Sequence, residues 1–296
     1  MAKAQETFSD FTYVPGIFSH DQQQTGPDSG FRAKTLPRLG ILDREYPSGD
    51  ASNDDAQWQR LHQHLQRLNR IDPQHERYKV LYVARHGEGV HNVKEREVGR
   101  HEWERHWSKL EGDGNVTWLN PSLTEKGFEQ ARELGVFWRN TIDHDHVPPP
   151  ESLYTSPLWR GLQTTDATWS NVLDLGRSRP VVTEELREVY GVHTCDKRGS
   201  ASATTEHFPD FVLAPGLSEE DELWTPDRRE TLDEHADLWR TFLQYLFDTD
   251  TSTFVSITTH SGATRALYAA IGHPDVWLAA GSVVPIMVRG RTPDST

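Results

Sequence analysis

Three short apolar runs, with helical patterns between them, limit this 296-residue chain to few folds. The runs cover residues 79–84, 152–155 and 253–258. A nearly continuous apolar run of this length is typical of a strand that is buried on both faces. Strands that alternate with helices favour a mainly parallel sheet with helices against both of its faces. We therefore predict an α/β protein with a three-layer α/β/α architecture.

Apolar residues spaced by three and four predict the helices. Thr124 is of a residue type that caps helix N-termini, and an apolar face follows it. Asp72-Pro73 is expected to stop the first helix. The other helical patterns are found at residues 54–68, 94–109, 158–173, 232–247 and 262–271. A last strand is predicted at residues 282–288, where Pro285 suits a sheet edge or a bulge.

The N-terminal part of the chain has a different composition from the rest. Residues 1–50 are rich in Gly, Pro, Ser, Asp and Gln, with scattered aromatic residues. We expect residues 1–75 to form an arm and a helix that pack on the core, held by Phe8, Phe11, Tyr13 and Phe18. Residues 76–296 are then expected to form a single globular domain.

The balance of charge restricts the partners of the protein. Asp and Glu outnumber Lys and Arg by 45 to 31, which gives a formal net charge of −14. A surface this acidic repels nucleic acids and anionic membranes. We therefore expect neither as a partner. The single cysteine, Cys195, allows no internal disulfide, and no run is apolar enough to span a membrane. These features predict a cytoplasmic protein; a homodimer is compatible with them.

A polar cluster follows each apolar run. The clusters are Arg85-His86-Gly87-Glu88, residues 156–160 and residues 259–262. Ligands of an open α/β sheet bind outside the carboxyl ends of its strands. We therefore expect two histidines and two arginines, which are far apart in the chain, to meet at one edge of the sheet.

This set of side chains suits phosphoryl transfer. A neutral imidazole held in one tautomer can attack phosphorus and form a covalent intermediate. Arginine binds phosphate oxygens bidentately, and a second histidine can stabilise the developing charge. A carboxylic acid is then needed to protonate the leaving alkoxide.

These residues resemble the signature motifs of the histidine phosphatase superfamily, in the branch that contains the cofactor-dependent phosphoglycerate mutases. The motifs occur in order at residues 85–88 with Asn92, and at 123–131, 154–164, 185–188 and 259–262. The resemblance covers residues 79–288. It implies a phosphoglycerate mutase-like fold and a small phosphorylated substrate, with neither a cofactor nor a metal.

The resemblance also implies a role for each matching residue. His86 would be phosphorylated, and Glu188 would donate the proton. Glu88 would either serve as an alternative acid or cap the helix that follows it. The phosphate would be bound by Arg85, Arg160 and His260, with Asn92 beside them.

The chain departs from the mutases in two places. Mutases usually carry Ser and Trp where this chain has Gly89-Val90-His91, and their long substrate-binding insert is not evident after Glu188. Residues 190–198 instead look like a group of fungal and plant mutase-like proteins that act as phosphatases. We therefore favour hydrolysis. The substrate-binding candidates are His91, His193, Lys197 and Arg198, although the last two could equally form a solvated turn.

Other interpretations remain open at this point. The same pocket could serve a mutase, or a lyase or dehydratase that acts on an anionic small molecule. A non-catalytic binding protein could also retain it. A metal site at His91, His101 and His106 is disfavoured, because their spacing matches no known zinc or dinuclear motif.

Overall fold

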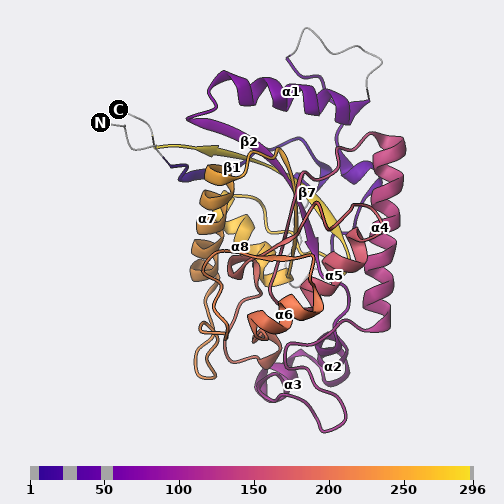
Figure 1. The fold of residues 1–296 in the computed structure, drawn as a ribbon, viewed down its shortest axis with the longest axis vertical. Helices are drawn as coiled ribbons and strands as arrows, with labels where there is room; N and C mark the ends of the chain where they lie inside the picture. The colour runs from indigo at the N-terminus through magenta and orange to yellow at the C-terminus, as the bar shows by residue number, and fades with distance from the viewer. Residues whose placement is uncertain (1–6, 23–31, 48–55, 294–296) are drawn as a thin grey trace.

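The computed structural model describes residues 7–22, 32–47 and 56–293, and its strands form one seven-stranded sheet. The strand order is β1-β7-β2-β6-β3-β4-β5 (Figure 1). The strands are β1 (Asp10–Tyr13), β2 (Glu76–Arg85), β3 (Ser152–Thr155), β4 (Val181–Val182), β5 (Val212–Leu213), β6 (Phe254–Thr259) and β7 (Val283–Arg291). Every neighbouring pair from β2 to β5 is parallel, whereas β7 runs antiparallel to β1 and β2. The predicted mainly parallel sheet is confirmed.

Helices cover both faces of this sheet, as predicted. The helices are α1 (Gln57–Ile71), α2 (Val90–Val98), α3 (Arg100–Arg105), α4 (Glu125–Asp145), α5 (Trp159–Trp169), α6 (Ala201–His207), α7 (Leu232–Thr249) and α8 (Ser261–Ile271). In Figure 1, α7 and α8 lie on one side of the strands, and α4 and α5 lie on the other. The protein therefore has the predicted three-layer α/β/α architecture.

Strand β2 shows why the first apolar run is nearly continuous. Leu81 and Val83 pack in a core cluster with residues of α7 and α8. Val80 and Tyr82 point the opposite way, into a cluster with residues of α1, α4 and α5. Successive side chains of a strand alternate between the two faces, and here both faces are covered. Each fully buried aliphatic side chain of this run contributes about 1.5–3 kcal/mol to the hydrophobic driving force.

Of the two settings expected to suit Pro285, a sheet edge and a bulge, the sheet edge is not the one found. Strand β7 lies inside the sheet, between β1 and β2. Its Pro285 is nevertheless tolerated, because β1 ends at Tyr13, opposite Val288. The Met287 carbonyl accepts a hydrogen bond from Val14 on the β1 side. By the two-residue period of a strand, Pro285 faces that same side, beyond the end of β1, where its missing N–H interrupts no ladder.

The described part of the N-terminal arm joins the core. Phe8 and Phe11 are buried, with ring centroids 5.8 Å and 5.3 Å from that of Phe247. Phe18 is buried against Trp58 of α1. Residues 54 and 55 of the predicted first helix lie outside the described residues. The division of the chain at residue 75 stays a prediction.

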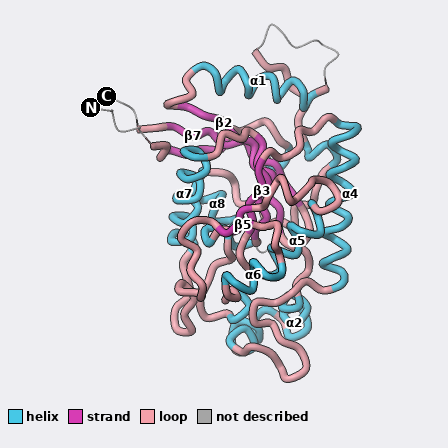
Figure 2. Tube along the Cα trace, in the orientation of Figure 1, coloured by secondary structure: helices cyan, strands magenta, loops and turns pink. Residues whose placement is uncertain are grey.

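Two helix termini show how local sequence sets the fold. Thr124 caps α4, since its Oγ1 accepts a hydrogen bond of 3.1 Å from the Gly127 N–H. The helix predicted for residues 94–109 is interrupted at Gly99, where φ is +81° and separates α2 from α3. Figure 2 shows α2 at the end of the molecule opposite α1, with α6 between α2 and the strands. No helix among the described residues is both long and apolar enough to cross a membrane.

Candidate active site

The three polar clusters meet at one edge of the sheet, as predicted. Strands β2, β6 and β3 are neighbours in the sheet, so the residues that follow them converge. The ring centroids of His86 and His260 are 4.9 Å apart. Arg160, in the first turn of α5, donates from Nε to His86 Nε2 at 3.3 Å. All three side chains are at most 2% exposed.

The His86 ring has the form that a nucleophile requires. Its Nδ1 donates to the Gly87 carbonyl at 2.6 Å, which leaves an unshared pair on Nε2. Burial lowers the pKa of His86 well below its usual range, and the charges of Arg160 and Arg85 lower it further. The bond to Gly87 opposes these effects but does not reverse them. The imidazole is therefore neutral, with one tautomer set by a backbone contact.

Several buried polar atoms around His86 have no hydrogen-bond partner among the described residues. They are Arg85 Nε, His91 Nδ1 and His260 Nδ1. The other ends of two of these side chains are held: Arg85 Nη1 donates to the Leu278 carbonyl at 2.8 Å, and His260 Nε2 shares a 2.6 Å hydrogen bond with Ser156 Oγ. A buried polar group without a partner costs about 1–3 kcal/mol, so an anion that supplied acceptors here would bind favourably.

Burial also lowers the pKa of both His91 and His260 well below the usual range, and the charge of Arg160 adds to the effect. A cluster of three imidazoles is thus kept neutral beside two guanidinium groups. The local charge is positive although the chain as a whole is strongly acidic. A pocket of this kind attracts a phosphate ester while the outer surface does not.

His86 opens into a cavity of about 250 Å³. Its lining includes five arginines, namely Arg32, Arg85, Arg100, Arg160 and Arg229. Four acidic residues also line it: Glu95, Glu104, Glu188 and Asp196. The predicted site residues His91, Asn92 and His193 are at the same cavity. Pockets for drug-sized ligands usually measure about 300–1,000 Å³, so this smaller volume suits a small metabolite.

Glu188 lies against the start of α8. Its carboxylate accepts hydrogen bonds of 3.0 Å from the backbone N–H groups of Gly262 and Ala263, and one of 2.9 Å from Val189 N–H. These bonds fix the carboxylate where it lines the cavity beside His86.

Glu88 does not cap the helix that follows it, and its role as an alternative acid stays a prediction. Helix α2 is capped by Gly89, whose N–H donates to Asn92 Oδ1 at 3.0 Å. The Glu88 carboxylate instead accepts a 2.9 Å hydrogen bond from Arg96. Burial alone would raise the pKa of Glu88, but the hydrogen bonds from Arg96 and Thr124 hold it below its usual range. An ionised carboxylate is a poor proton donor.

The predicted substrate-binding residues of the segment after Glu188 separate into two groups. His193 lines the cavity, with Nε2 3.1 Å from Glu104 Oε2. Lys197 and Arg198 do not belong to the lining. The Lys197 ammonium lies 5.1 Å from the ring centroid of Trp224. The Arg198 guanidinium is buried, pairs with Glu184 and donates to the carbonyl groups of residues 218–220, so it holds the loop together.

Among the described residues, the turn at residues 193–196 brings together side chains that could offer ligands to a metal. Ligand atoms of His193, Cys195 and Asp196 lie within 4.8 Å of one another. Both carboxylate oxygens of Asp196 are already bonded to guanidinium groups, from Arg160 and Arg229. Burial also raises the pKa of the Cys195 thiol well above its usual range. A divalent cation would meet two fixed positive charges, so this donor set does not fit one.

Several other residues that line the cavity were not among the predicted site residues. Glu95, Arg100, Trp103 and Glu104 come from α2 and α3, and Arg229 precedes α7. Burial raises the pKa of Glu95, and the nearby charge of Glu104 adds to the rise, although Arg100 and Arg85 oppose it. In the sequence, the only signal for these α2 and α3 residues is the cluster of charged side chains at residues 95–104.

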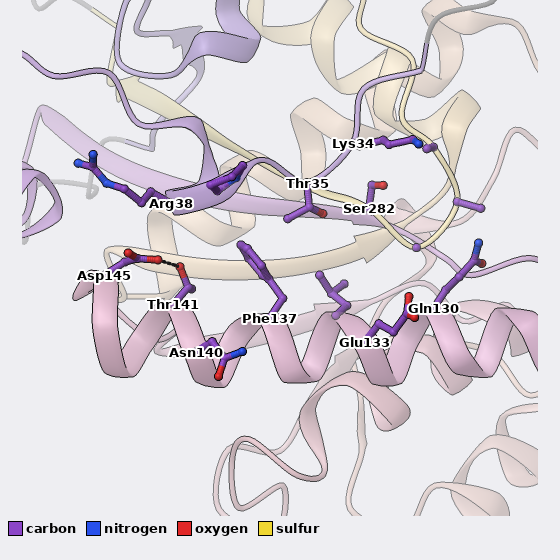
Figure 3. Close-up of a pocket in the computed structure, with 15 residues that line it drawn as sticks. Lys34, Thr35, Arg38, Gln130, Glu133, Phe137, Asn140, Thr141, Asp145 and Ser282 are labelled. Carbon is purple, nitrogen blue, oxygen red and sulfur yellow. Dashed lines mark hydrogen bonds between the residues drawn. The ribbon is translucent and has the colours of Figure 1, made fainter.

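A larger cavity, of about 730 Å³, lies beside α4 (Figure 3). It is lined by Phe137, Thr141 and other α4 residues, together with Lys34 and Arg38 of the arm. No histidine is among its lining residues, and none of the predicted site residues lies there. The predicted site residues His86, His91, Arg160 and Glu188 line the smaller cavity instead.

Comparison with known proteins agrees with this site. Residues 81–278 match the histidine phosphatase superfamily (branch 1), a stretch that includes all five motifs. The chain is 37% identical over 288 residues to "Probable phosphoglycerate mutase" of Arthroderma benhamiae, which covers 95% of this chain and 85% of that protein. It is also 31% identical over 299 residues to "Probable phosphoglycerate mutase PMU1" of Saccharomyces cerevisiae. That alignment covers 93% of this chain and 95% of the relative.

A likeness to solved structures is also found. Bacillus stearothermophilus YhfR overlaps 70% of this chain and 90% of its own, at 23% sequence identity and a TM-score of 0.44. The family assignment itself rests on the motif-bearing match, which spans most of the chain, and on the two fungal relatives. The chain belongs to the histidine phosphatase superfamily, branch 1, and is a phosphatase-type enzyme.

Proposed function

We propose that the protein hydrolyses a small phosphorylated metabolite through a phosphohistidine on His86. The observation that carries this proposal is the neutral His86 ring, whose Nε2 is directed at the guanidinium of Arg160. The unpartnered nitrogens of Arg85 and His260 lie around the same ring and support a phosphate there.

In the first step, His86 Nε2 attacks phosphorus and the bond to the ester oxygen breaks. Arg160 Nε gives up its hydrogen bond to Nε2 and donates to a phosphoryl oxygen instead. Arg85 and His260 stabilise the negative charge on the other oxygens. Glu188 in its acid form protonates the leaving alkoxide.

In the second step, water attacks the phosphohistidine from the side that the alcohol has left. The Glu188 carboxylate accepts a proton from this water. The P–N bond breaks, its electron pair returns to His86 Nε2, and phosphate departs. The enzyme is then ready for another turnover with no net change in its residues.

The experiment compares His86→Ala and His86→Asn with the unmodified protein. We expect both variants to lose more than 1,000-fold in kcat on 4-nitrophenyl phosphate, since the covalent step has no substitute. Acid-quenched wild-type enzyme should show a phosphohistidine by ³¹P NMR or mass spectrometry. Full activity in either variant would reject the mechanism. Activity should also survive chelator treatment, and a loss that zinc restores would favour a metallohydrolase.

A mutase is the second candidate, because the names of both fungal relatives specify a phosphoglycerate mutase. A mutase would need to retain its substrate while the phosphoryl group moves. The Gly89-Val90-His91 sequence and the altered segment after Glu188 support hydrolysis instead. Incubation with 3-phosphoglycerate separates the two reactions: a mutase forms 2-phosphoglycerate, whereas a hydrolase releases phosphate.

Glu188 and Glu95 are the two carboxyl groups to compare as the proton donor. Motif position supports Glu188, and the raised pKa of Glu95 makes it the alternative. Glu188→Gln should slow hydrolysis of alkyl phosphates, whose leaving group needs a proton, far more than hydrolysis of 4-nitrophenyl phosphate. If Glu95→Gln shows this selective loss and Glu188→Gln does not, the proton donor is Glu95.

A further inference from the structure

We propose that Asp196 is a positioning residue for phosphoryl transfer, which acts by holding the guanidinium of Arg160 against His86. This inference rests on the proposed function, since it assigns Arg160 to the phosphate. Asp196 does not touch His86 in any hydrogen bond that we observe between described residues. Its effect must therefore pass through the arginine.

The guanidinium of Arg160 is held on three sides. Nε donates to His86 Nε2, Nη1 donates to the Cys195 carbonyl at 2.6 Å, and Nη2 donates to Asp196 Oδ1 at 2.9 Å. Two of these three bonds come from consecutive residues of one short turn, η6 (Thr194–Asp196). That turn presents a carbonyl and a carboxylate to the two terminal nitrogens and leaves Nε to face the nucleophile.

The turn is itself fixed from behind. Arg187 Nη2 donates to the Asp196 carbonyl at 2.7 Å, and Thr194 Oγ1 donates to the Leu110 carbonyl at 2.6 Å. Arg187 is in turn paired with the buried carboxylate of Asp221. A carboxylate on an anchored backbone can impose a single orientation on a long, otherwise flexible side chain.

Asp196 also neutralises the buried positive charge of Arg160. Arg160 and Asp196 are both almost fully buried, and the second oxygen of Asp196 accepts a 3.1 Å hydrogen bond from Arg229. Burial alone would raise the pKa of Asp196, but the charges of Arg229 and Arg160 hold it below its usual range. Asp196 is thus an ionised counter-ion. Without it, Arg160 would be a buried cation with only a carbonyl and an imidazole as partners.

The test uses a double-mutant cycle of Asp196→Asn and Arg160→Gln, measured with 4-nitrophenyl phosphate and with orthovanadate as a phosphoryl analogue. In the wild-type background, we expect D196N to lower kcat at least tenfold with little change in KM, and to weaken vanadate inhibition by a similar factor. In the R160Q background, D196N should change kcat less than twofold, because the group that it positions is gone. Equal losses in the two backgrounds would overturn the proposal.

Asp21→Asn is the matched control, because it removes a buried carboxylate that pairs with His273 and neither lines the cavity nor bonds to η6. It should lower the melting temperature without lowering kcat in the folded protein. A drop in kcat equal to that of D196N would show a merely structural role.

Two further measurements distinguish the proposal from a general loss of folding and from a failure of the proposed reaction. R160Q/D196N should melt at a higher temperature than D196N, since it lacks the unpaired buried cation. Equal melting temperatures for the two variants, or failure of both to fold, would contradict the pairing. Should the wild-type protein bind vanadate but release no phosphate, the proposed function fails. Weaker vanadate binding by D196N in calorimetry would still support the link to Arg160, and unchanged binding would reject it.

Discussion

Gly262→Ala should displace the proposed proton donor, Glu188, without changing that residue itself. Gly262 occupies the first turn of α8, and its N–H donates to the Glu188 carboxylate. A Cβ at this position would lie 2.1 Å from Glu188 Oε1 and 3.0 Å from its Cδ. Ordinary van der Waals contact begins near 3.4 Å, so the carboxylate must retreat by more than about 1 Å.

The expected loss follows from that displacement. A catalytic group misplaced by about 1 Å can lose roughly 100-fold in rate, and a positioned acid contributes about 10²–10⁴-fold. We expect G262A to lower kcat/KM for an alkyl phosphate about 100-fold, or about 2.7 kcal/mol of transition-state stabilisation. For 4-nitrophenyl phosphate, whose leaving group departs as an anion, the loss should be under fivefold.

The fold should tolerate this substitution. Alanine is favoured over glycine in a helix by up to about 1 kcal/mol, so the melting temperature should not fall greatly. Phosphate release from the two esters, measured side by side for wild-type, G262A and E188Q, tests the reasoning. G262A should match E188Q in its preference for the activated ester. Wild-type rates on the alkyl ester, or an equal loss on both esters, would refute the assignment of Glu188.

Two further predictions concern stability. Burial holds the pKa values of His86, His91 and His260 below the usual value of 6.5. Below pH 6.5 the unfolded state therefore binds more protons than the folded state. The free energy of unfolding should decrease there by about 1.4 kcal/mol per pH unit for each histidine. Urea unfolding at pH 7, 6 and 5 checks this sign, and His91→Asn should make the slope shallower; a stability that rises on acidification would contradict it. Arg198→Lys should lower the free energy of unfolding by about 3 kcal/mol, because a buried guanidinium with a carboxylate and several carbonyl partners is lost. Its kcat should stay within twofold of the wild-type value in a steady-state assay, and a selective loss of kcat with unchanged stability would restore Arg198 to the site.

The sequence by itself determined the layers of the fold and the chemistry at their edge. The apolar runs are short and bounded, so they favour strands over helices, and the alternation of the β2 side chains between two core clusters follows from strand geometry. Polar residues at the ends of parallel strands must share one edge. The sequence pattern therefore predicts that His86, Arg160 and His260 lie close together.

The tertiary structure alone decided contacts that depend on long-range pairing. Strand β7 is interior because the distant β1 adds to its far side, which no local pattern encodes. Glu88 is an ordinary acid in the sequence, and it becomes a fixed carboxylate only because Arg96 and Thr124 fold against it. Asp196 likewise carries no signal of its own. It acquires Arg160, 36 residues away, and Arg229 as partners only because the chain folds them against the turn of η6, and burial strengthens both ion pairs.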